Sequence, residues 1–477
     1  MSLDATWREV GGLAIALGLL LLVGRAVLSL GARGLAGEWP ERLALSFLVG
    51  AGTISLLGFW LSPLFGLVPA QWLLSLVAVG LAVVAWRRRR TVPHTSSSAS
   101  TAPLDTAERR WLTKVLTAGI ALQAAALLFV AMQTSLGWDG LLNMELKAHL
   151  AFVNEPSGQL PPGYLSDESR VWSHPGYPLL VPLTEVWLYD WIGRPHQGLI
   201  KLLFPIFYLS LAGLFYGALR RVMLRTPALV GCAALGLLPM LAIGPGAAIT
   251  GYADVPLAAV LFGAVSYGFF ALRGGDRTDV ALAVLLASLA LWTKREGAVL
   301  AAYVVLALAG ARAAGALHRG QTPFDAARRG LALLVVPALV AVPWTLMQRL
   351  HGLPDPDLSP VTVGTLAANV SRFPAILQLL ARELTLPGHW AALWPAFAFT
   401  LVLSWRRLRE PAELFLAGAV VVPLAVYATI FVFSSWPEYT EHVGTALPRL
   451  VIPLAPLALF ATIRHLRASL MPLDVRG

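Results

Sequence analysis

The sequence predicts an all-helical protein that crosses a membrane many times. Hydrophobic residues occupy 57% of its 477 positions, charged residues occupy only 13%, and the mean hydropathy is +0.69. A soluble protein carries roughly 25% charged residues, and a disordered chain is far less apolar. The composition therefore excludes a water-soluble enzyme and an intrinsically disordered protein. It predicts an all-α polytopic membrane protein.

The apolar segments can be taken in order along the chain. A spanning helix needs about 20 mostly apolar residues, and about 13 transmembrane helices are expected. They lie near residues 11–30, 43–62, 69–86, 111–134, 197–219, 227–246, 252–272, 279–293, 297–311, 331–350, 389–404, 412–434 and 450–466.

Two neighbouring spans, 279–293 and 297–311, are short and are separated by charged residues. A single helix over both would be about 33 residues, or about 50 Å long, which is too long for one crossing. We therefore expect a hairpin of two short spans with the charges in its turn.

The basic residues predict the orientation of these spans. Arginine runs such as Arg87–Arg90 flank apolar segments, as membrane anchors do, so the net charge of +10 does not indicate a nucleic-acid partner. With the hairpin, 23 basic residues lie in loops on one face and nine on the other. The positive-inside rule places the richer face in the cytoplasm. The N-terminus is then outside and the C-terminus inside.

Residues 91–110 are rich in Ser, Thr and Pro near their start and predict a disordered cytoplasmic linker. This linker separates a three-span N-terminal unit, residues 1–90, from a larger transmembrane module, residues 111–477. In the module, two outer loops are long, 137–196 and 351–388.

Each outer loop contains an amphipathic segment, at Asp139 to Asn154 and at residues 361–385, which predicts a helix on the membrane surface. Acidic residues concentrate on this outer side, and no predicted span has a carboxylate near its middle. Ion-coupled transporters usually need titratable groups within the membrane. The pattern therefore favours chemistry at the outer membrane–water boundary.

The motif GWDG places Asp139 directly after the fourth span, with Trp138 as an interfacial anchor. Asp139 is a candidate general base for an acceptor hydroxyl and a candidate metal ligand. The alternative is an N-cap of the following helix.

The motif SHPGYPLLVPL places His174 at the end of the same loop, where it could donate to a phosphate or orient a carboxylate. The alternative is a solvated histidine in a turn.

The motif TKREG fills the turn of the predicted hairpin. Lys294 and Arg295 can neutralise a phosphate, and Glu296 can hold one of them. The alternative is a pair of snorkelling anchors.

Two further motifs reach the same outer boundary. GYADVP offers Asp254 as a second carboxylate or as an N-cap, and TALPRLVIPLAP offers Arg449 as a phosphate ligand or as an anchor.

Taken in this order over residues 111–466, these motifs resemble the GT-C glycosyltransferases. The resemblance is strongest to prokaryotic dolichyl-phosphate-mannose-type protein mannosyltransferases and to aminoarabinose transferases. It implies a GT-C-like fold in a prokaryotic cytoplasmic membrane. It also implies a polyprenyl-phosphate-linked sugar donor and a lipid, glycan or protein acceptor, with inverting transfer on the outer face.

The resemblance also implies roles for single residues. It assigns the essential acid to Asp139. It assigns the donor phosphate to Lys294, Arg295, Arg449 and Lys147. The supporting residues are His174, Asp254, Glu296, Tyr252 and Trp138. A divalent cation, Mg²⁺ or Mn²⁺, is the candidate cofactor, and its requirement stays open because Asp139 stands alone where the family often has an acidic pair. Asp139 and Asp254 are the candidate ligands.

Two other functions remain open at this point. A lipid or polysaccharide transporter would need a polar path through the membrane and often has repeated halves, and the sequence shows neither clearly. A non-catalytic scaffold of envelope assembly is the other alternative.

Overall fold

The computed structural model describes residues 5–31, 37–91, 107–154, 160–161, 163–352 and 357–470. In these ranges all regular secondary structure is helical, apart from an isolated antiparallel bridge between Leu358 and Ser434. The prediction of an all-α protein is confirmed. The predicted linker falls mostly on residues 92–106, outside the described residues.

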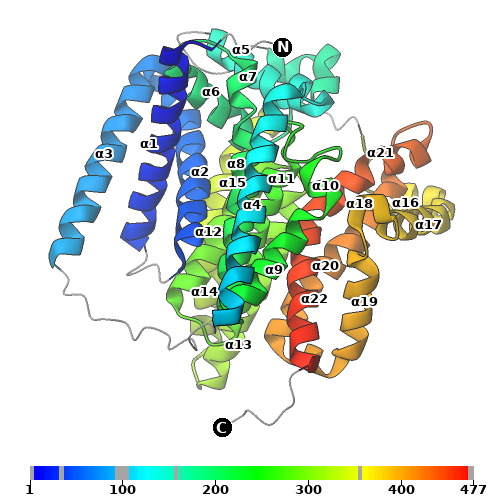
Figure 1. The fold of residues 1–477 in the computed structure, drawn as a ribbon. Coiled ribbons are helices and arrows are strands. Elements are labelled where there is room, and N and C mark those ends of the chain that lie inside the picture. Colours follow the sequence, from blue (N-terminus) through cyan, green and yellow to red (C-terminus); the bar gives the residue numbers. More distant parts are fainter. Residues whose placement is uncertain are drawn as a thin grey trace. The chain divides into compact units, whose positions relative to one another are not determined.

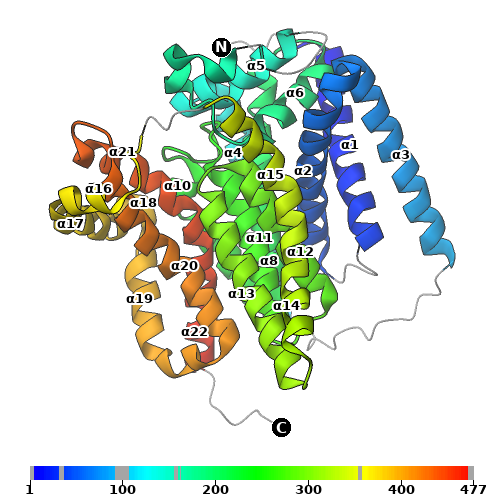
Figure 2. The same ribbon diagram turned by 180° about the vertical axis from the view of Figure 1, so that it is seen from behind.

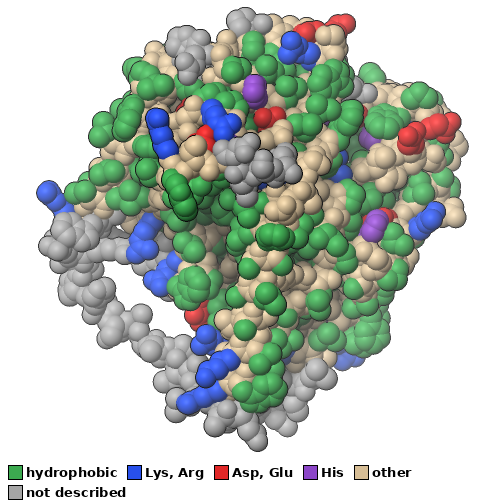
Figure 3. Space-filling view, turned by 45° about the horizontal axis from the view of Figure 1, so that its top comes forward, with side chains coloured by type: hydrophobic (Ala, Val, Ile, Leu, Met, Phe, Trp, Pro, Cys, Tyr) green, Lys and Arg blue, Asp and Glu red, His purple; other side chains and the backbone are tan. Residues whose placement is uncertain are grey.

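Ten helices in the described part of the chain are long and apolar enough to cross a membrane. They are Trp7–Leu30, Trp39–Phe65, Leu67–Val84, Arg110–Gln133, Gln197–Arg220, Asp254–Leu272, Gly297–His318, Pro323–Leu350, Pro411–Phe433 and Tyr439–Ser469. All ten coincide with predicted spans, which confirms a multi-pass integral membrane protein. Hydrophobic side chains are spread over the face shown in Figure 3, as contact with lipid requires.

The other three predicted spans form shorter helices, namely α9 (Arg225–Gly236), α12 (Arg277–Thr293) and α19 (Leu393–Leu403). The expected count of 13 therefore stays a prediction.

The expected hairpin is confirmed, because α12 and α13 (Gly297–His318) flank a turn at Lys294. The expected length of the second arm is wrong. The helix α13 has 22 residues, because the alanine-rich stretch after Gly310 favours helix and carries it past Arg312.

The chain divides into two compact units. Unit 1 comprises Met1–Pro161, Leu179–Gly236 and Ala248–Gly251, and unit 2 comprises Pro162–Pro178, Leu237–Ala247 and Tyr252–Gly477. This division does not follow the predicted boundary at the linker, because the first four spans belong to the same unit. The predicted separation of a three-span unit from the rest of the chain at residues 91–110 stays a prediction.

Unit 1 is a bundle around α2 (Trp39–Phe65), which packs against α1 (Trp7–Gly31), α8 (Leu203–Arg220) and α6 (Leu180–Ile192) (Figure 1). In the same unit α4 (Ala107–Gln133) packs against α9. Its other helices are α3 (Leu67–Thr91), the π-helix η1 (Gly140–Glu145), α5 (Leu146–Val153) and α7 (Gln197–Ile200).

The helices α1 and α2 approach each other through glycines. A Cβ atom on Gly24 would lie 1.8 Å from the carbonyl oxygen of Ser46, and one on Gly50 would lie 1.9 Å from that of Leu20. Only residues without a side chain allow backbones to come this close. The contact between α1 and α2 therefore depends on both glycines.

Unit 2 surrounds α11 (Asp254–Leu272), which packs against α12, α13 and α20 (Pro411–Ile430) (Figure 2). The helix α11 is apolar all round and almost wholly buried, as expected of a central helix. The other elements of the unit are η2 (Tyr164–Ser166), η3 (Glu168–Ser173), α10 (Pro239–Ala242), α14 (Pro323–Leu331), η4 (Ala332–Leu334), α15 (Val335–Leu350), α16 (Val363–Asn369), η5 (Val370–Arg372), α17 (Phe373–Leu384), α18 (Pro387–Trp390), η6 (Trp405–Arg409), η7 (Phe431–Phe433), α21 (Tyr439–Val451), η8 (Ile452–Leu454) and α22 (Ala455–Leu470).

Both predicted surface segments are helical. The first forms η1 and α5, and the second forms α16, η5 and α17. No residue of α16 is buried, and in α17 only Ile376 and Glu383 are. Their placement on the membrane surface stays a prediction.

The close contact between α1 and α2 gives a test of unit 1. We expect Gly24→Ala to lower the stability of the protein by about 1–3 kcal/mol, because the new methyl group meets backbone that cannot move away. Thermal unfolding of the purified protein in detergent measures this effect. Gly18→Ala in the same helix is the control, since a Cβ there meets nothing within 4 Å. Equal unfolding midpoints for the two variants would contradict the packing argument.

Candidate functional site

A buried ionic cluster joins the start of α11 to the turn between α12 and α13. The Asp254 side chain is fully buried, and its Oδ1 lies 2.7 Å from Nζ of Lys294, which is only 3% exposed. Nζ of Lys294 is also 3.2 Å from Oε1 of Glu296. On the other side, Nε of Arg449 from α21 lies 3.5 Å from Oδ2 of Asp254. The structure thus brings together four of the residues that the sequence singled out.

The electrostatics of Lys294 follow from these neighbours. Burial acts to lower its pKa, but the carboxylates of Asp254 and Glu296 act more strongly in the opposite direction, so the pKa is raised. Lys294 therefore stays protonated at neutral pH.

A lysine this buried does not fit the alternative of a snorkelling anchor. Asp254 does not fit the N-cap alternative either, because the cap position of α11 is Ala253.

Tyr252 supports the cluster from the side. The guanidinium carbon of Arg449 lies 4.4 Å from the centre of the Tyr252 ring. At this distance a cation is attracted by the ring face. The tyrosine of GYADVP therefore helps to fix the arginine of PRLVIPLAP. Its supporting role in a reaction stays a prediction.

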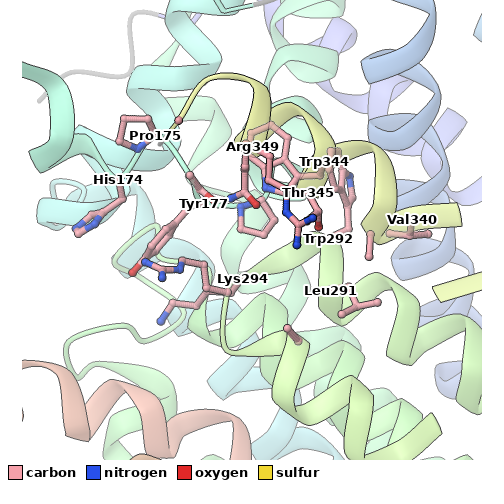
Figure 4. Close-up of a pocket in the computed structure, with 17 residues that line it drawn as sticks. His174, Pro175, Tyr177, Leu291, Trp292, Lys294, Val340, Trp344, Thr345 and Arg349 are labelled. Carbon is pink, nitrogen blue, oxygen red and sulfur yellow. Dashed lines mark hydrogen bonds between the residues drawn. The ribbon is translucent and has the colours of Figure 1, made fainter. Parts of the chain in front are cut away.

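Next to Lys294 lies a cavity of about 480 Å³ in unit 2 (Figure 4). Its lining includes three basic side chains, Lys294, Arg295 and Arg349, and no carboxylate. Apolar and aromatic residues complete the wall, among them Leu291, Trp292, Ala298, Val340, Ala341 and Trp344. The cavity therefore combines an excess of positive charge with an apolar surface.

The loop His174–Pro178 forms one edge of this cavity. In Figure 4 the side chains of His174, Tyr177 and Lys294 extend in the same direction, while Trp344 and Arg349 lie on the other side of the cavity. The rings of His174 and Tyr177 stack at 4.8 Å, and the Arg295 guanidinium carbon lies 5.9 Å from the Tyr177 ring centre. The motif HPGYP thus arranges polar groups on one side of the cavity.

Two residues of this region were missed by sequence reasoning. Arg349 lies at the outer end of the predicted span 331–350. The outer face has few basic residues, so a basic residue at this position is a signal that could have marked it as a candidate. Asp357 lies in the outer loop 351–388, and its Oδ2 is 3.6 Å from Nδ1 of His174. No motif marked Asp357, and only the fold brings it to the histidine.

Asp139 lies in unit 1, at the start of η1. It is 7% exposed, and its side chain makes no cap hydrogen bond, so the N-cap alternative does not hold. Asp139, Asn143 and Lys147 follow at intervals of four residues, which places them on one helix face. Trp138 beside them is 65% exposed, as expected of an interfacial anchor.

Lys147 is enclosed in unit 1. It is 1% exposed, and its ammonium group donates a hydrogen bond to Oδ1 of Asn143. Burial lowers the pKa of Lys147 to about 7, against the opposing effect of the Asp139 charge. Its expected contact with a donor phosphate stays a prediction, since the ammonium group is buried among protein groups.

The sequence-predicted residues therefore fall into two groups. Unit 2 contains Asp254, Lys294, Glu296, Arg449, Tyr252, Arg295 and His174, and unit 1 contains Asp139, Lys147 and Trp138. In the described part of the chain no three His, Cys, Asp or Glu side chains form a group that could hold a metal ion. A metal role for Asp139 and Asp254, which lie in different units, stays a prediction.

The chain matches no family model, no curated protein and no solved structure. The resemblance to the GT-C glycosyltransferases consequently rests on the sequence motifs alone.

The buried ion pair gives a test of the cluster. We expect Lys294→Met to destabilise the protein by about 3–5 kcal/mol, because it leaves the Asp254 carboxylate buried without its nearest cation. Thermal unfolding in detergent measures the loss. Arg295→Gln is the control, since this neighbouring side chain is exposed. The double variant Asp254→Asn, Lys294→Met should recover part of the loss, and a double variant less stable than Lys294→Met would contradict the pairing.

Lys147 predicts a pH dependence of stability. Its pKa is about 7 in the folded protein, against about 10.4 for an unfolded lysine. Between these values the unfolded chain binds a proton that the folded protein does not, so stability rises with pH by up to about 1.4 kcal/mol per unit. Unfolding midpoints from pH 7 to 10 should show this slope, and Lys147→Met should remove its share. The exposed Lys114→Met should leave the slope unchanged. A slope that survives in Lys147→Met would refute the assignment.

Proposed function

We propose that the protein is an integral-membrane glycosyltransferase of the GT-C type. It moves a hexosyl or pentosyl group from a polyprenyl-phosphate donor to an acceptor hydroxyl of a lipid, glycan or protein. The reaction takes place at the outer face of a prokaryotic cytoplasmic membrane, with the N-terminus outside and the C-terminus in the cytoplasm. The observation that carries the proposal is the cavity of unit 2, where basic side chains meet an apolar wall.

The charges of the cavity suit a lipid-linked phosphate. In the neighbouring cluster the charges of Lys294 and Arg449 are offset by those of Asp254 and Glu296. The excess positive charge at the cavity therefore comes from two exposed side chains, Arg295 and Arg349. Guanidinium groups bind phosphate oxygens in a bidentate manner, and no carboxylate lines the cavity to repel the anion.

The apolar wall suits the prenyl chain of such a donor. Trp292 and Trp344 meet edge to face, with ring centres 6.0 Å apart. The helix α15, which carries Trp344, also exposes Leu339, Val342 and Leu346 on its surface. A prenyl chain can leave the cavity along this helix toward the bilayer. The cavity volume lies within the range of small-molecule sites, about 300–1,000 Å³.

The chemistry requires a base and a stabilised leaving group. The acceptor oxygen attacks the anomeric carbon, the bond from this carbon to the phosphate oxygen breaks, and the lipid phosphate gains one negative charge. Cations at the cavity stabilise this charge as it develops. Asp139 takes the acceptor proton, and attack from the opposite side inverts the anomeric centre. The assignment of Asp139 comes from its motif, and its burial beside Lys147 is compatible with a carboxylate held in one position.

Release of lipid phosphate tests the function directly. Purified protein is incubated with a panel of polyprenyl-phosphate sugars and acceptors, and the freed prenyl phosphate is measured. A transporter or a scaffold would release none, so absence of release from every donor would overturn the proposal.

Asp139→Asn should reduce the turnover of a folded protein by about 100-fold or more, because it removes the general base. Full activity of this variant would exclude Asp139 as the base.

The arginines of the cavity give a separate test on donor affinity. Arg295→Gln together with Arg349→Gln should weaken donor binding by about tenfold to a hundredfold per lost charge-assisted contact. Arg382→Gln is the matched control, since this exposed arginine lies on α17 and does not line the cavity. Titration of a prenyl-phosphate sugar at fixed acceptor measures the effect. Unchanged affinity in the double variant would remove the cavity as the donor site.

A further inference from the structure

Arginines gather at one end of unit 2, where α19 is followed by α20. The 3₁₀ helix η6 between them carries Arg406, Arg407 and Arg409. In Figures 1 and 2 the lower ends of α19, α20 and α22 lie together. The guanidinium of Arg407 donates a hydrogen bond of 3.2 Å to the carbonyl oxygen of Ala468, which ties η6 to the end of α22. The orientation predicted from the charges places this end at the cytoplasmic surface.

Two of these arginines share one aromatic ring. The guanidinium carbons of Arg406 and Arg409 lie 5.6 Å and 5.4 Å from the centre of the Trp405 ring. In a 3₁₀ helix, residues three apart lie on the same side, so the backbone also brings the two cations together. All three side chains are exposed, and no described carboxylate pairs with either arginine. Two fixed guanidinium groups are therefore accessible to an anion.

A second pair of arginines shares the ring of Phe269. The guanidinium carbons of Arg464 and Arg273 lie 4.5 Å and 5.7 Å from its centre. Arg464 is buried and forms an ion pair with the fully buried carboxylate of Glu413. Nε2 of His465 lies 3.3 Å from the same carboxylate. The charge of Glu413 is thus used within the protein, while Arg273 is exposed.

The two arginine pairs are electrostatic neighbours. The charges of Arg273 and Arg407 both act on Arg464, and the only opposing charge with a marked effect on it besides its ion pair is that of Glu410. Like charges at short range repel each other. The two carboxylates, Glu410 and Glu413, are fewer than the arginines around them. An anion bound by the exposed arginines offsets this excess of positive charge.

An apolar surface leads directly to the arginines. Phe399, Val402 and Leu403 at the end of α19 are exposed, and their spacing places them on one helix face. Leu414 in the first turn of α20 is exposed as well. Trp405 lies where this surface meets the arginines, and tryptophan favours the boundary between membrane and water. The surface therefore changes from apolar to cationic within a few residues.

We propose that this end of unit 2 binds an anionic phospholipid. The phosphodiester of its headgroup lies on Arg406 and Arg409, whose guanidinium groups match phosphate oxygens. Its acyl chains lie along the exposed face of α19. Basic surfaces between spanning helices on the cytoplasmic side bind such headgroups. The site goes beyond the proposed function, and its arginines are not among those that line the donor cavity.

Thermal unfolding with added lipid tests the site. The full-length protein in a neutral detergent is titrated with phosphatidylglycerol, and phosphatidylcholine serves as the uncharged comparison. The unfolding midpoint of the wild-type protein should rise only with phosphatidylglycerol, because a ligand of the folded state stabilises it. Arg406→Gln together with Arg409→Gln should raise the concentration needed by about tenfold or more, since charge-assisted contacts are lost. An unchanged titration of this double variant would overturn the proposal.

The matched control is Arg328→Gln together with Arg329→Gln. These two exposed arginines lie in the last turn of α14, and the variant has the same change in net charge. It should follow the wild-type titration. Equal weakening in both double variants would mean that lipid is attracted by net charge alone, and it would overturn the site.

Trp405→Leu tests the arrangement of the arginines without removing a charge. It should weaken phosphatidylglycerol binding by about threefold, because the ring no longer fixes the two guanidinium groups. Wild-type affinity in this variant would contradict the role of the shared ring.

Glycerol 1-phosphate separates a lipid site from a site for free phosphate, since it carries a phosphate without acyl chains. It should not raise the unfolding midpoint at concentrations where phosphatidylglycerol saturates, and equal stabilisation by both would overturn the lipid as the occupant. None of these measurements involves a sugar donor, so their outcome is independent of glycosyl transfer.

Discussion

The ion pair between Asp254 and Lys294 is the interaction on which the candidate site of unit 2 depends. Both side chains are buried, and removal of either one leaves the other charge buried without its nearest partner. The pair fixes the start of the central helix α11 to the turn between α12 and α13. Arg449 adds α21 to the same carboxylate. One carboxylate thus holds three segments that are far apart in the sequence.

This constraint explains the division of roles between neighbouring residues. Lys294 is drawn inward to Asp254, and its partner charges are satisfied within the protein. Arg295, the next residue, is exposed and faces the Tyr177 ring at the cavity. The two adjacent basic residues of the turn therefore lie in different surroundings. Lys294 is buried in the ionic cluster, and Arg295 is exposed at the cavity.

Unit 1 uses a different principle, since its packing relies on close backbone contact. Gly24 and Gly50 let α1 and α2 touch where no side chain fits. On the segment after α4, Asp139 and Lys147 are buried on one helix face with Asn143 between them. Burial disfavours the charge of the lysine more than the aspartate favours it, so the pKa of Lys147 falls to about 7. The charge of Lys147 beside Asp139 therefore changes as the pH passes through about 7.

The sequence by itself determined the helical class, ten of the spanning helices, the hairpin around Lys294 and the helical character of residues 139–154 and 361–385. These features follow from local hydrophobicity and from the cost of burying charge, which act over a few turns of chain. The length of α13 was missed because the predicted span stopped at the apolar stretch, whereas alanine continues a helix beyond it. The motifs GYADVP, TKREG and TALPRLVIPLAP marked Asp254, Lys294, Glu296 and Arg449 as candidates.

Only the tertiary structure decided how these residues combine. The pairing of Asp254 with Lys294 joins positions 40 residues apart, and the spacing of charges in a sequence does not specify such a partner. Asp357 could not be chosen from the sequence, because its contact with His174 depends on how the loop His174–Pro178 packs. A side chain gains its electrostatic role from neighbours that the fold supplies, and long-range contacts of this kind leave no periodic pattern in the chain.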